Sequence, residues 1–203
     1  MKQILVATNN RGKLNEFIEM FKKQENINLN TFSDVSVDID VLEDGETFKE
    51  NAIKKAKESF EAINCKMPVI SEDSGLLVDA LNGAPGVYSK RYYDGKTDEE
   101  GNEMLLDELK NVKKEFRTAK YLVVMCYYDG VNLIIQEGEC KGKIAFSQRG
   151  KEGFSYDYIF IPDENNNEEK TFGELGLEFK NEISHRKRAI SKLMLELEAN
   201  NIL

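Results

Sequence analysis

The first twenty-one residues change their hydrophobic period once, and this change restricts the fold more than any other feature of the sequence. Residues 4–7 form a continuous apolar run, which is typical of a strand buried on both faces. After a polar loop that contains Gly12, apolar side chains recur at helical spacing, at Leu14, Phe17, Ile18 and Phe21. The chain therefore begins as strand, loop and helix, which predicts an α/β protein.

Further elements are indicated along the chain. Thr47 and Glu50 form a capping box, which predicts that a helix begins there. The middle of the chain predicts a strand over 68–71 that delivers residues 72–75 into a loop, then a turn at 82–86, and then a helix over 98–112 with Met104, Leu105 and Leu109 facing inward. Strands are predicted over 121–128 and 131–137, joined by a hairpin turn at Asp129-Gly130, and over 143–147 and 159–161. The chain then predicts a polar loop over 163–170 and a helix over 187–199. We therefore expect an α/β protein with a mixed sheet flanked by helices, rather than a regular doubly wound fold.

Length and charge narrow the class of protein. A chain of 203 residues suits one domain over 1–203, with two lobes around one cleft, better than two independent domains. Its 28 basic and 37 acidic residues give a formal charge of −9, which argues against nucleic-acid binding through a basic face. The three cysteines follow no metal or disulfide pattern, and no signal peptide or membrane span is visible. We expect a cytoplasmic protein without a membrane partner.

The loop after the first strand is a candidate anion site. Thr8, Asn9, Asn10, Arg11, Gly12 and Lys13 lead into a helix, whose N-terminus presents backbone N–H groups and a positive dipole end. Lysine in the first turn is unfavourable for the helix itself, and a phosphate partner would explain Lys13. An ordinary strand–helix turn capped by Asn9 or Asn10 is an equal alternative. The spacing differs from that of a P-loop, which counts against a kinase or a motor ATPase.

Adjacent carboxylates form the second candidate. Glu72 and Asp73 follow a buried strand, where α/β sheets commonly place their ligands, and Glu43 precedes them in the chain. Mg²⁺ binds one or two carboxylates together with phosphates and waters, and one of these carboxylates can also activate a water. The alternative is a turn in which Asp73 bonds its own backbone.

Two later segments complete the candidates. His185, the only histidine, and Arg186 open the last helix together with Lys187 and Arg188; they either point donors at a ligand or form an exposed basic helix end. The aromatic and acidic residues over 153–157 either stack on and hydrogen-bond a base or form a turn that packs two rings into the core.

These segments, in this order, resemble the inosine triphosphate pyrophosphatase family. The matching pieces span almost the whole chain and are ATNNRGK (7–13), FKENAIKKA (48–56), SEDSGLLVDALNGAPGVYSKRY (71–92), GFSYD (153–157) and SHRKRA (184–189). The resemblance implies hydrolysis of ITP, dITP and XTP between the α and β phosphates with Mg²⁺. It also implies an elongated mixed sheet flanked by helices, with a central active-site cleft between two lobes, and a homodimer.

The resemblance assigns roles residue by residue. Residues Thr8 to Lys13 and Lys55 would contact the triphosphate, Glu43 and Asp73 would hold the metal, and Asp73, beside Glu72, would act as general base. Contacts to the rest of the substrate would come from Ser74, Phe154, Ser155, Tyr156, Asp157, Lys180, His185 and Arg186. Arg186 and His185 are expected to donate to the carbonyl at the six position of the base, which adenine lacks.

Two positions depart from the family pattern. The family commonly has glycine at Ser155 and proline at Tyr158, and a positive φ at position 155 would strain a serine. Two rivals to a purine triphosphate hydrolase are a nucleotide-binding regulator without turnover and a Maf-type enzyme acting on modified pyrimidine triphosphates. The joint presence of Lys13, Glu43, Asp73 and His185 favours the enzyme, since a sensor needs no water-activating acid.

Overall fold

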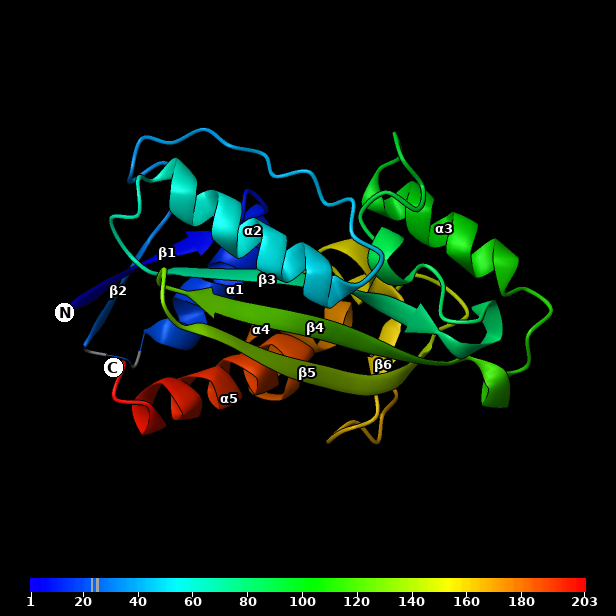
Figure 1. Ribbon diagram of the computed structural model, residues 1–203. Coiled ribbons are helices and arrows are strands. Elements are labelled where there is room, and N and C mark those ends of the chain that lie inside the picture. The colour runs from blue at the N-terminus through cyan, green and yellow to red at the C-terminus, as the bar shows by residue number, and fades with distance from the viewer. Residues whose placement is uncertain (23, 25) are drawn as a thin grey trace. The chain divides into compact units, whose positions relative to one another are not determined.

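The computed structural model describes residues 1–22, 24 and 26–203, and it contains a mixed six-stranded sheet with flanking helices (Figure 1). The elements are β1 (Lys2–Ala7), α1 (Arg11–Phe21), β2 (Ile27–Asn30), α2 (Phe48–Ala62), β3 (Val69–Val78), α3 (Asp98–Glu108), β4 (Thr118–Tyr128), β5 (Leu133–Ile144), β6 (Phe160–Pro162), α4 (Phe172–Ile183) and α5 (His185–Ala199). The strand order is β2-β1-β3-β4-β5-β6. β1 runs parallel to β2 and β3, whereas β5 and β6 are antiparallel, which confirms the predicted mixed α/β sheet.

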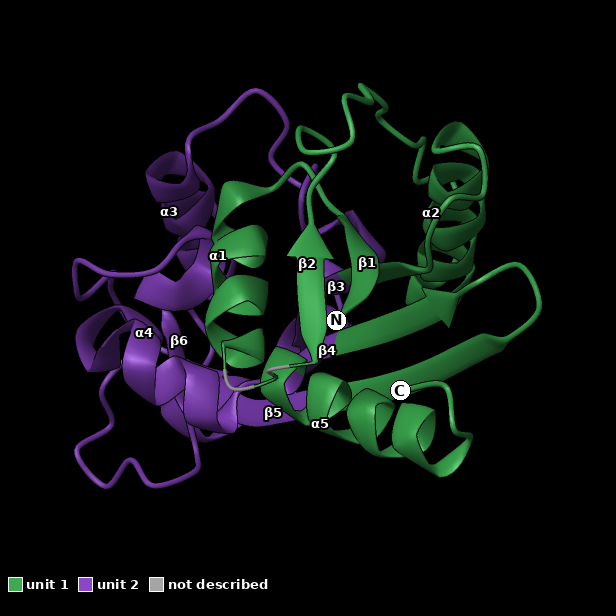
Figure 2. Cartoon of the chain, turned by 90° about the vertical axis from the view of Figure 1, so that its left-hand side faces the viewer, with its two compact units in different colours: residues 1–73, 123–138, 186–203 green, residues 74–122, 139–185 purple. Residues whose placement is uncertain are grey.

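The chain divides into two compact units, each built from separate segments (Figure 2). Unit 1 contains residues 1–73, 123–138 and 186–203, and unit 2 contains 74–122 and 139–185. The chain passes between the units within β3, β4 and β5 and after the first residue of α5. Each unit has its own buried core, described separately below.

In unit 1 the sheet is buried on both faces. Ile4 and Val6 of β1 pack with Phe17 of α1 and with the apolar stripe of α5, whereas Leu5 and Ala7 pack on the other side with α2. This division follows from the twofold period of a strand, in which successive side chains point to opposite faces. Figures 1 and 2 show α2 over one face of this part of the sheet and α1 and α5 over the other.

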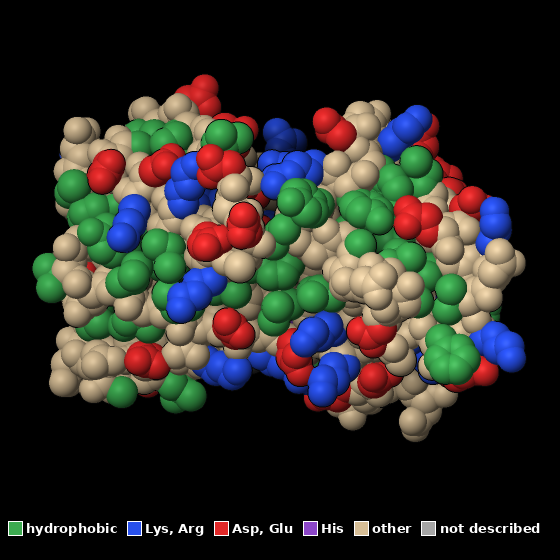
Figure 3. All heavy atoms as spheres, turned by 45° about the vertical axis from the view of Figure 1, so that its right-hand side comes forward, with side chains coloured by type: hydrophobic (Ala, Val, Ile, Leu, Met, Phe, Trp, Pro, Cys, Tyr) green, Lys and Arg blue, Asp and Glu red, His purple; other side chains and the backbone are tan. Residues whose placement is uncertain are grey.

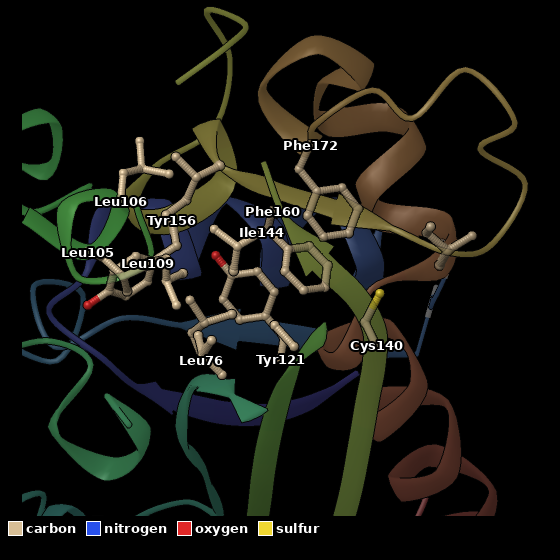
Figure 4. Close-up of a cluster of buried hydrophobic side chains, with 14 residues drawn as sticks. Leu76, Leu105, Leu106, Leu109, Tyr121, Cys140, Ile144, Tyr156, Phe160 and Phe172 are labelled. Atoms are coloured by element: carbon tan, nitrogen blue, oxygen red, sulfur yellow. The ribbon is translucent and has the colours of Figure 1, made fainter. Parts of the chain in front are cut away.

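The core of unit 2 is rich in aromatic rings. Figure 4 shows Tyr121, Phe160 and Phe172 pointing toward one another, and their ring centroids lie 4.7 Å (121–160) and 5.4 Å (160–172) apart. Leu105 and Leu109, both fully buried, anchor α3 against the same cluster. These contacts fix α3, β4 and β6 as a common support for the turn that follows β5.

Most predicted elements are confirmed, and the differences have physical causes. Residues 72–75 lie inside β3 and not in a loop, because the strand continues to Val78. Met104 is 43% exposed, so its assignment to the inward face of the helix was wrong, and Ile18, at the predicted helical spacing, is exposed to the same extent. The helix predicted over 98–112 ends at Glu108. Of the strand predicted over 143–147, residues 143 and 144 are the end of β5, and residues 145–147 lie outside the strands.

Two elements had no counterpart among the predicted ones. β2 has only four residues, two of them Asn, and α4 contains Gly176 with a φ of 82°, which interrupts its helical periodicity. Within the described residues, every helix is too short or too polar to cross a bilayer.

Candidate active site

β3 places the carboxylates of Glu72 and Asp73 on opposite faces of the sheet. Ser71 and Asp73 point toward α2, where Ser71 Oγ donates to the Ala52 carbonyl at 2.6 Å and Asp73 Oδ2 accepts from Asn51 Nδ2 at 2.9 Å. Glu72, between them, points to the opposite face, toward α1 and α5. The alternation of a strand therefore gives Glu72 and Asp73 different partners although they are neighbours in sequence.

Glu72 is held by two cations. Arg186 donates from Nε and Nη2 to the two carboxylate oxygens of Glu72, at 2.6 and 2.7 Å, in a bidentate pair. Lys13 Nζ lies 3.0 Å from Glu72 Oε1. Because Glu72 is only 1% exposed, the two cations compensate a carboxylate that water does not reach.

Arg186 is also paired with Glu16, a fully buried residue of α1. Burial alone would lower the pKa of Arg186, but the charges of Glu72 and Glu16 raise it, so the guanidinium stays ionised. At least three of its five N–H donors point at carboxylates of unit 1. The structure thus directs Arg186 to Glu72, and its contact with a base stays a prediction.

Asp73 occupies a different environment. Asn51 donates to Asp73 from its amide nitrogen and accepts from the Gly45 backbone N–H at 2.8 Å, so it ties the loop before α2 to the carboxylate. A Cβ at Gly45 would lie 2.7 Å from Asn51 Oδ1, which explains glycine at this close approach. Burial raises the pKa of Asp73 and Glu43 raises it further, while the Asn51 hydrogen bond and Lys55 lower it.

Lys55 connects the second acidic residue to this site. Its Nζ forms an ion pair with Glu43 and donates to the Glu72 backbone carbonyl at 2.9 Å. Glu43 acts on the ionisation of Asp73, so the two carboxylates lie within electrostatic range of each other. In the described part of the chain, no cluster of three or more His, Cys, Asp or Glu side chains is arranged for a metal. A pair of carboxylates is nevertheless what Mg²⁺ uses when phosphates and waters complete its shell.

The loop after β1 is a capped helix start. Asn10 is the N-cap of α1, and its Oδ1 accepts the Lys13 backbone N–H at 3.0 Å. Thr8 Oγ1 accepts the Asn10 N–H at 3.2 Å, and Asn9 Nδ2 donates to the Ile39 carbonyl at 2.9 Å. Arg11 is exposed and Gly12 is half-buried. This arrangement is compatible with both alternatives for the loop.

Unit 2 brings together a second set of predicted residues. Lys180 Nζ donates to Asp157 Oδ2 at 2.6 Å and lies 4.4 Å from the centre of the Phe154 ring. Asp157, fully buried, also accepts the Phe154 backbone N–H at 3.0 Å and the Tyr121 hydroxyl at 3.4 Å. The His185 ring stacks on Tyr121 with centroids 4.8 Å apart and planes 9° from parallel. Ser74, half-buried, follows Asp73 on β3.

The segment 154–157 has features of both alternatives from the sequence, which were a turn that packs rings into the core and a site that stacks on a base. Tyr156 packs in the core of unit 2 and donates to the Ser89 carbonyl at 2.9 Å, as expected for a turn that buries a ring. Phe154 is half-buried, with Lys180 over its face. Ser155 has a φ of 56°, which confirms that position 155 needs the left-handed conformation that strains a serine.

Three residues of these arrangements were missed by sequence reasoning: Glu16, Asn51 and Tyr121. Glu16 is buried on α1 but lies outside the apolar stripe of Leu14, Phe17, Ile18 and Phe21, so the sequence pattern carries no signal for it. Asn51 lies inside the matched segment 48–56, four residues before Lys55 and therefore on the same helix face. Tyr121 had no signal beyond the strand pattern, since its role comes from packing against distant residues.

Comparison with known proteins identifies the family of the chain. The chain is 43% identical to a dITP/XTP pyrophosphatase of Clostridium perfringens, over 95% of this chain and 96% of that protein, and 41% identical to one of Bacillus subtilis, over 98% of each. The solved structure of the Staphylococcus aureus Ham1 protein superposes with a TM-score of 0.83 at 39% identity, covering 98% of this chain and all of that one. The sequence model of the Ham1 family matches residues 4–196. The chain therefore belongs to the Ham1 family.

Proposed function

We propose that this protein hydrolyses purine nucleoside triphosphates whose base carries a carbonyl at the six position, namely ITP, dITP and XTP. The products are the nucleoside monophosphate and pyrophosphate. The observation that carries the proposal is the buried pair Glu72 and Asp73, flanked by Lys13 and Lys55, in a chain related to proteins named dITP/XTP pyrophosphatases.

Phosphate binding is assigned to the N-terminal part of unit 1. Residues Thr8 to Lys13 surround the start of α1, where backbone N–H groups and the helix dipole favour an anion. Lys13 and Lys55 add two cations beside the carboxylates. Both lysines are more than four-fifths buried, so their charges are less screened than those of surface lysines.

Asp73 is proposed as the general base. It accepts the proton of the water that attacks the α phosphorus, and pyrophosphate leaves. Asp73 accepts a hydrogen bond from the neutral amide of Asn51, whereas Glu72 is bound in an ion pair with Arg186 and Lys13. Since a carboxylate that pairs with two cations is a weak base, we assign Glu72 to positioning Lys13 and Asp73 to proton transfer.

Magnesium is proposed as the cofactor, held by Asp73 and Glu43. The donor set fits, because Mg²⁺ prefers oxygen ligands and needs few protein carboxylates when phosphate oxygens and waters are present. When bound, the ion supplies positive charge that neutralises the triphosphate and polarises its phosphoryl oxygens. Lys55 pairs with Glu43 and so fixes the position of this proposed metal ligand.

Recognition of the base is assigned to unit 2. Lys180 and His185 can donate to a six-carbonyl, and Phe154 offers an aromatic face for stacking. Asp157 fixes Lys180, and Tyr121 fixes the His185 ring. Adenine presents an amino group at the six position, so these donors would stay unpaired against ATP. Ser74, Ser155, Tyr156 and Arg186 remain proposed substrate contacts on the resemblance alone.

The protein is further proposed to act as a cytoplasmic homodimer, with residues 1–203 as one domain. The resemblance supports the dimer, and the unpatterned cysteines support a reducing compartment. Figure 3 shows Lys and Arg interspersed with Asp and Glu on the face in view, in line with a small-molecule substrate rather than a nucleic acid. Light scattering at micromolar concentration tests the dimer: a mass of only 23.2 kDa would contradict it.

The experiment that tests the proposed function is product analysis with ITP, XTP and dTTP. We expect pyrophosphate and monophosphate from ITP and XTP in the presence of Mg²⁺, little from dTTP, and loss of turnover when EDTA removes the metal. Water labelled with ¹⁸O should place the label in the monophosphate, because attack occurs at the α phosphorus. Preferential turnover of dTTP would support an enzyme of the Maf type, and binding of ITP without products would support a regulator.

A further inference from the structure

Ser155 is held in its left-handed conformation by two side chains of α3. Its backbone N–H donates to Asp98 Oδ2 at 2.6 Å, and its carbonyl accepts from Asn102 Nδ2 at 2.9 Å. A residue other than glycine disfavours a φ of 56°, because its Cβ crowds the backbone. Both backbone polar groups of this one strained residue are therefore fixed from a single helix.

Asp98 and Asn102 are suited to this role by their places in α3. They are four residues apart and so lie on the same face of the helix. α3 begins with a capping box of Thr97 and Glu100, and its inner face is anchored in the core of unit 2. The two side chains therefore extend from a rigid element toward a strained turn.

Asn102 is itself oriented by a neighbour. Its Nδ2 also donates to Gln148 Oε1 at 3.2 Å, and the Gln148 amide nitrogen donates to the Glu99 carbonyl at 3.1 Å and to Glu103 Oε1 at 2.8 Å. The side chain of Asn102 is only 1% exposed, so water competes little for these hydrogen bonds. The Asn102 amide is thus fixed with both N–H donors in use.

We infer that Asp98 and Asn102 are positioning residues for base recognition, which they serve by clamping Ser155. The inference rests on the proposed function. Ser155 lies between Phe154, whose ring faces Lys180, and Asp157, which binds Lys180. If φ of Ser155 relaxed to a negative value, the Phe154 ring and the Asp157 carboxylate would change their relative position. The clamp therefore maintains the geometry of the Lys180 site.

The test measures kcat and KM for ITP in variants of the clamp. Asp98 is exposed, so Asp98→Ala is expected to fold, and it should raise KM about fivefold with kcat nearly unchanged. Asp98→Asn keeps an oxygen acceptor and should restore most of the affinity. Asn102→Ala removes the buried half of the clamp and should raise KM roughly tenfold. Asp107→Ala, on the same helix and at an exposed carboxylate that pairs with Lys110, is the control and should leave KM unchanged.

Combination with Ser155→Gly separates a clamp from a general effect on α3. Glycine adopts positive φ without strain, so Asp98→Ala should raise KM only about twofold in the Ser155→Gly background. An equal effect of Asp98→Ala in both backgrounds would overturn the inference.

Hydrogen–deuterium exchange of residues 153–158 reads the clamp without any substrate. Exchange should increase in Asp98→Ala and not in Asp107→Ala, and equal exchange in wild type and Asp98→Ala would refute the clamp. Absence of ITP hydrolysis by the wild type would instead refute the proposed function, with exchange still deciding the clamp.

Discussion

Each unit of the protein contains a buried ion pair, and the two pairs are built differently. In unit 1, Arg186 is bound by the carboxylates of Glu72 and Glu16 in a planar, bidentate arrangement. In unit 2, Lys180 binds the single carboxylate of Asp157 and lies over an aromatic ring. A guanidinium with this many carboxylate bonds is fixed in place, whereas an ammonium is a compact charge with three donors that can rotate.

This difference matches the two functions proposed for the units, which are catalysis for unit 1 and base recognition for unit 2. The Arg186 pair fixes Glu72 and, through it, Lys13, which we propose as a phosphate contact. The Lys180 pair places an ammonium next to aromatic surface, which suits the proposed recognition of a planar base. We therefore expect variants of unit 1 to change turnover of every substrate, and variants of unit 2 to change the choice among substrates.

Asp73→Asn is expected to have the largest effect. Loss of a general base alone lowers kcat by ~10²–10⁴-fold. Because burial already disfavours the ionised form of Asp73, the neutral amide should leave the melting temperature unchanged or higher. Steady-state kinetics with ITP and ATP should show the same relative loss for both. The control is Asp44→Asn, which alters an exposed ion pair with Lys54 and should retain wild-type kcat. A near wild-type rate for Asp73→Asn would remove Asp73 from the mechanism.

Arg186→Ala is expected to reduce both stability and turnover. Breaking a buried ion pair by removing one partner costs about 3–5 kcal/mol, since Glu16 would lose the guanidinium and Glu72 would lose its bidentate partner while keeping Lys13. The structure predicts an equal loss with ITP and ATP, whereas a direct contact to the base predicts a selective loss with ITP. Urea unfolding and kinetics on both substrates decide between them. Lys192→Ala, in an exposed part of α5, is the matched control.

The sequence singled out residues of the candidate site but not the residues that bind them. Lys13, Glu72 and Asp73 lie in local motifs, which can be recognised in the sequence even when the end of the neighbouring strand is assigned wrongly. The opposite faces of Glu72 and Asp73 could not be predicted, because residues 72–75 were assigned to a loop and the alternation of β3 was lost.

The partners of Arg186 were missed for a related reason. A basic helix start was interpreted as a ligand site, since the sequence gives no sign that Glu16 and Glu72 converge there across 170 and 114 residues. Strain at Ser155 was predictable from the residue type, but the support from Asp98 and Asn102 comes from a separate helix. These contacts arise from tertiary packing between residues distant in sequence, and local sequence patterns carry no information about such packing.

Tyr121→Leu is expected to have the smallest of these effects, confined to unit 2. It removes the ring that stacks on His185, and a stacked pair of this kind contributes about 0.5–1.5 kcal/mol. KM for ITP should therefore rise roughly threefold while kcat is unchanged. Tyr121→Phe keeps the ring and loses only the long 3.4 Å hydrogen bond to Asp157, so it serves as the control and should resemble the wild type. An equal effect of both variants would assign the role to the hydroxyl instead of the ring.

The most direct test of the division between catalysis and recognition is the ratio of kcat/KM for ITP to that for ATP in the wild-type protein. A site whose donors require a six-carbonyl rejects an amino group in its place by ~10⁴-fold or more. We predict a ratio of this order, strong use of XTP and dITP, and leakage, if any, toward GTP, which shares the six-carbonyl. Comparable values for ITP and ATP would contradict the assignment of Lys180 and His185 to base recognition.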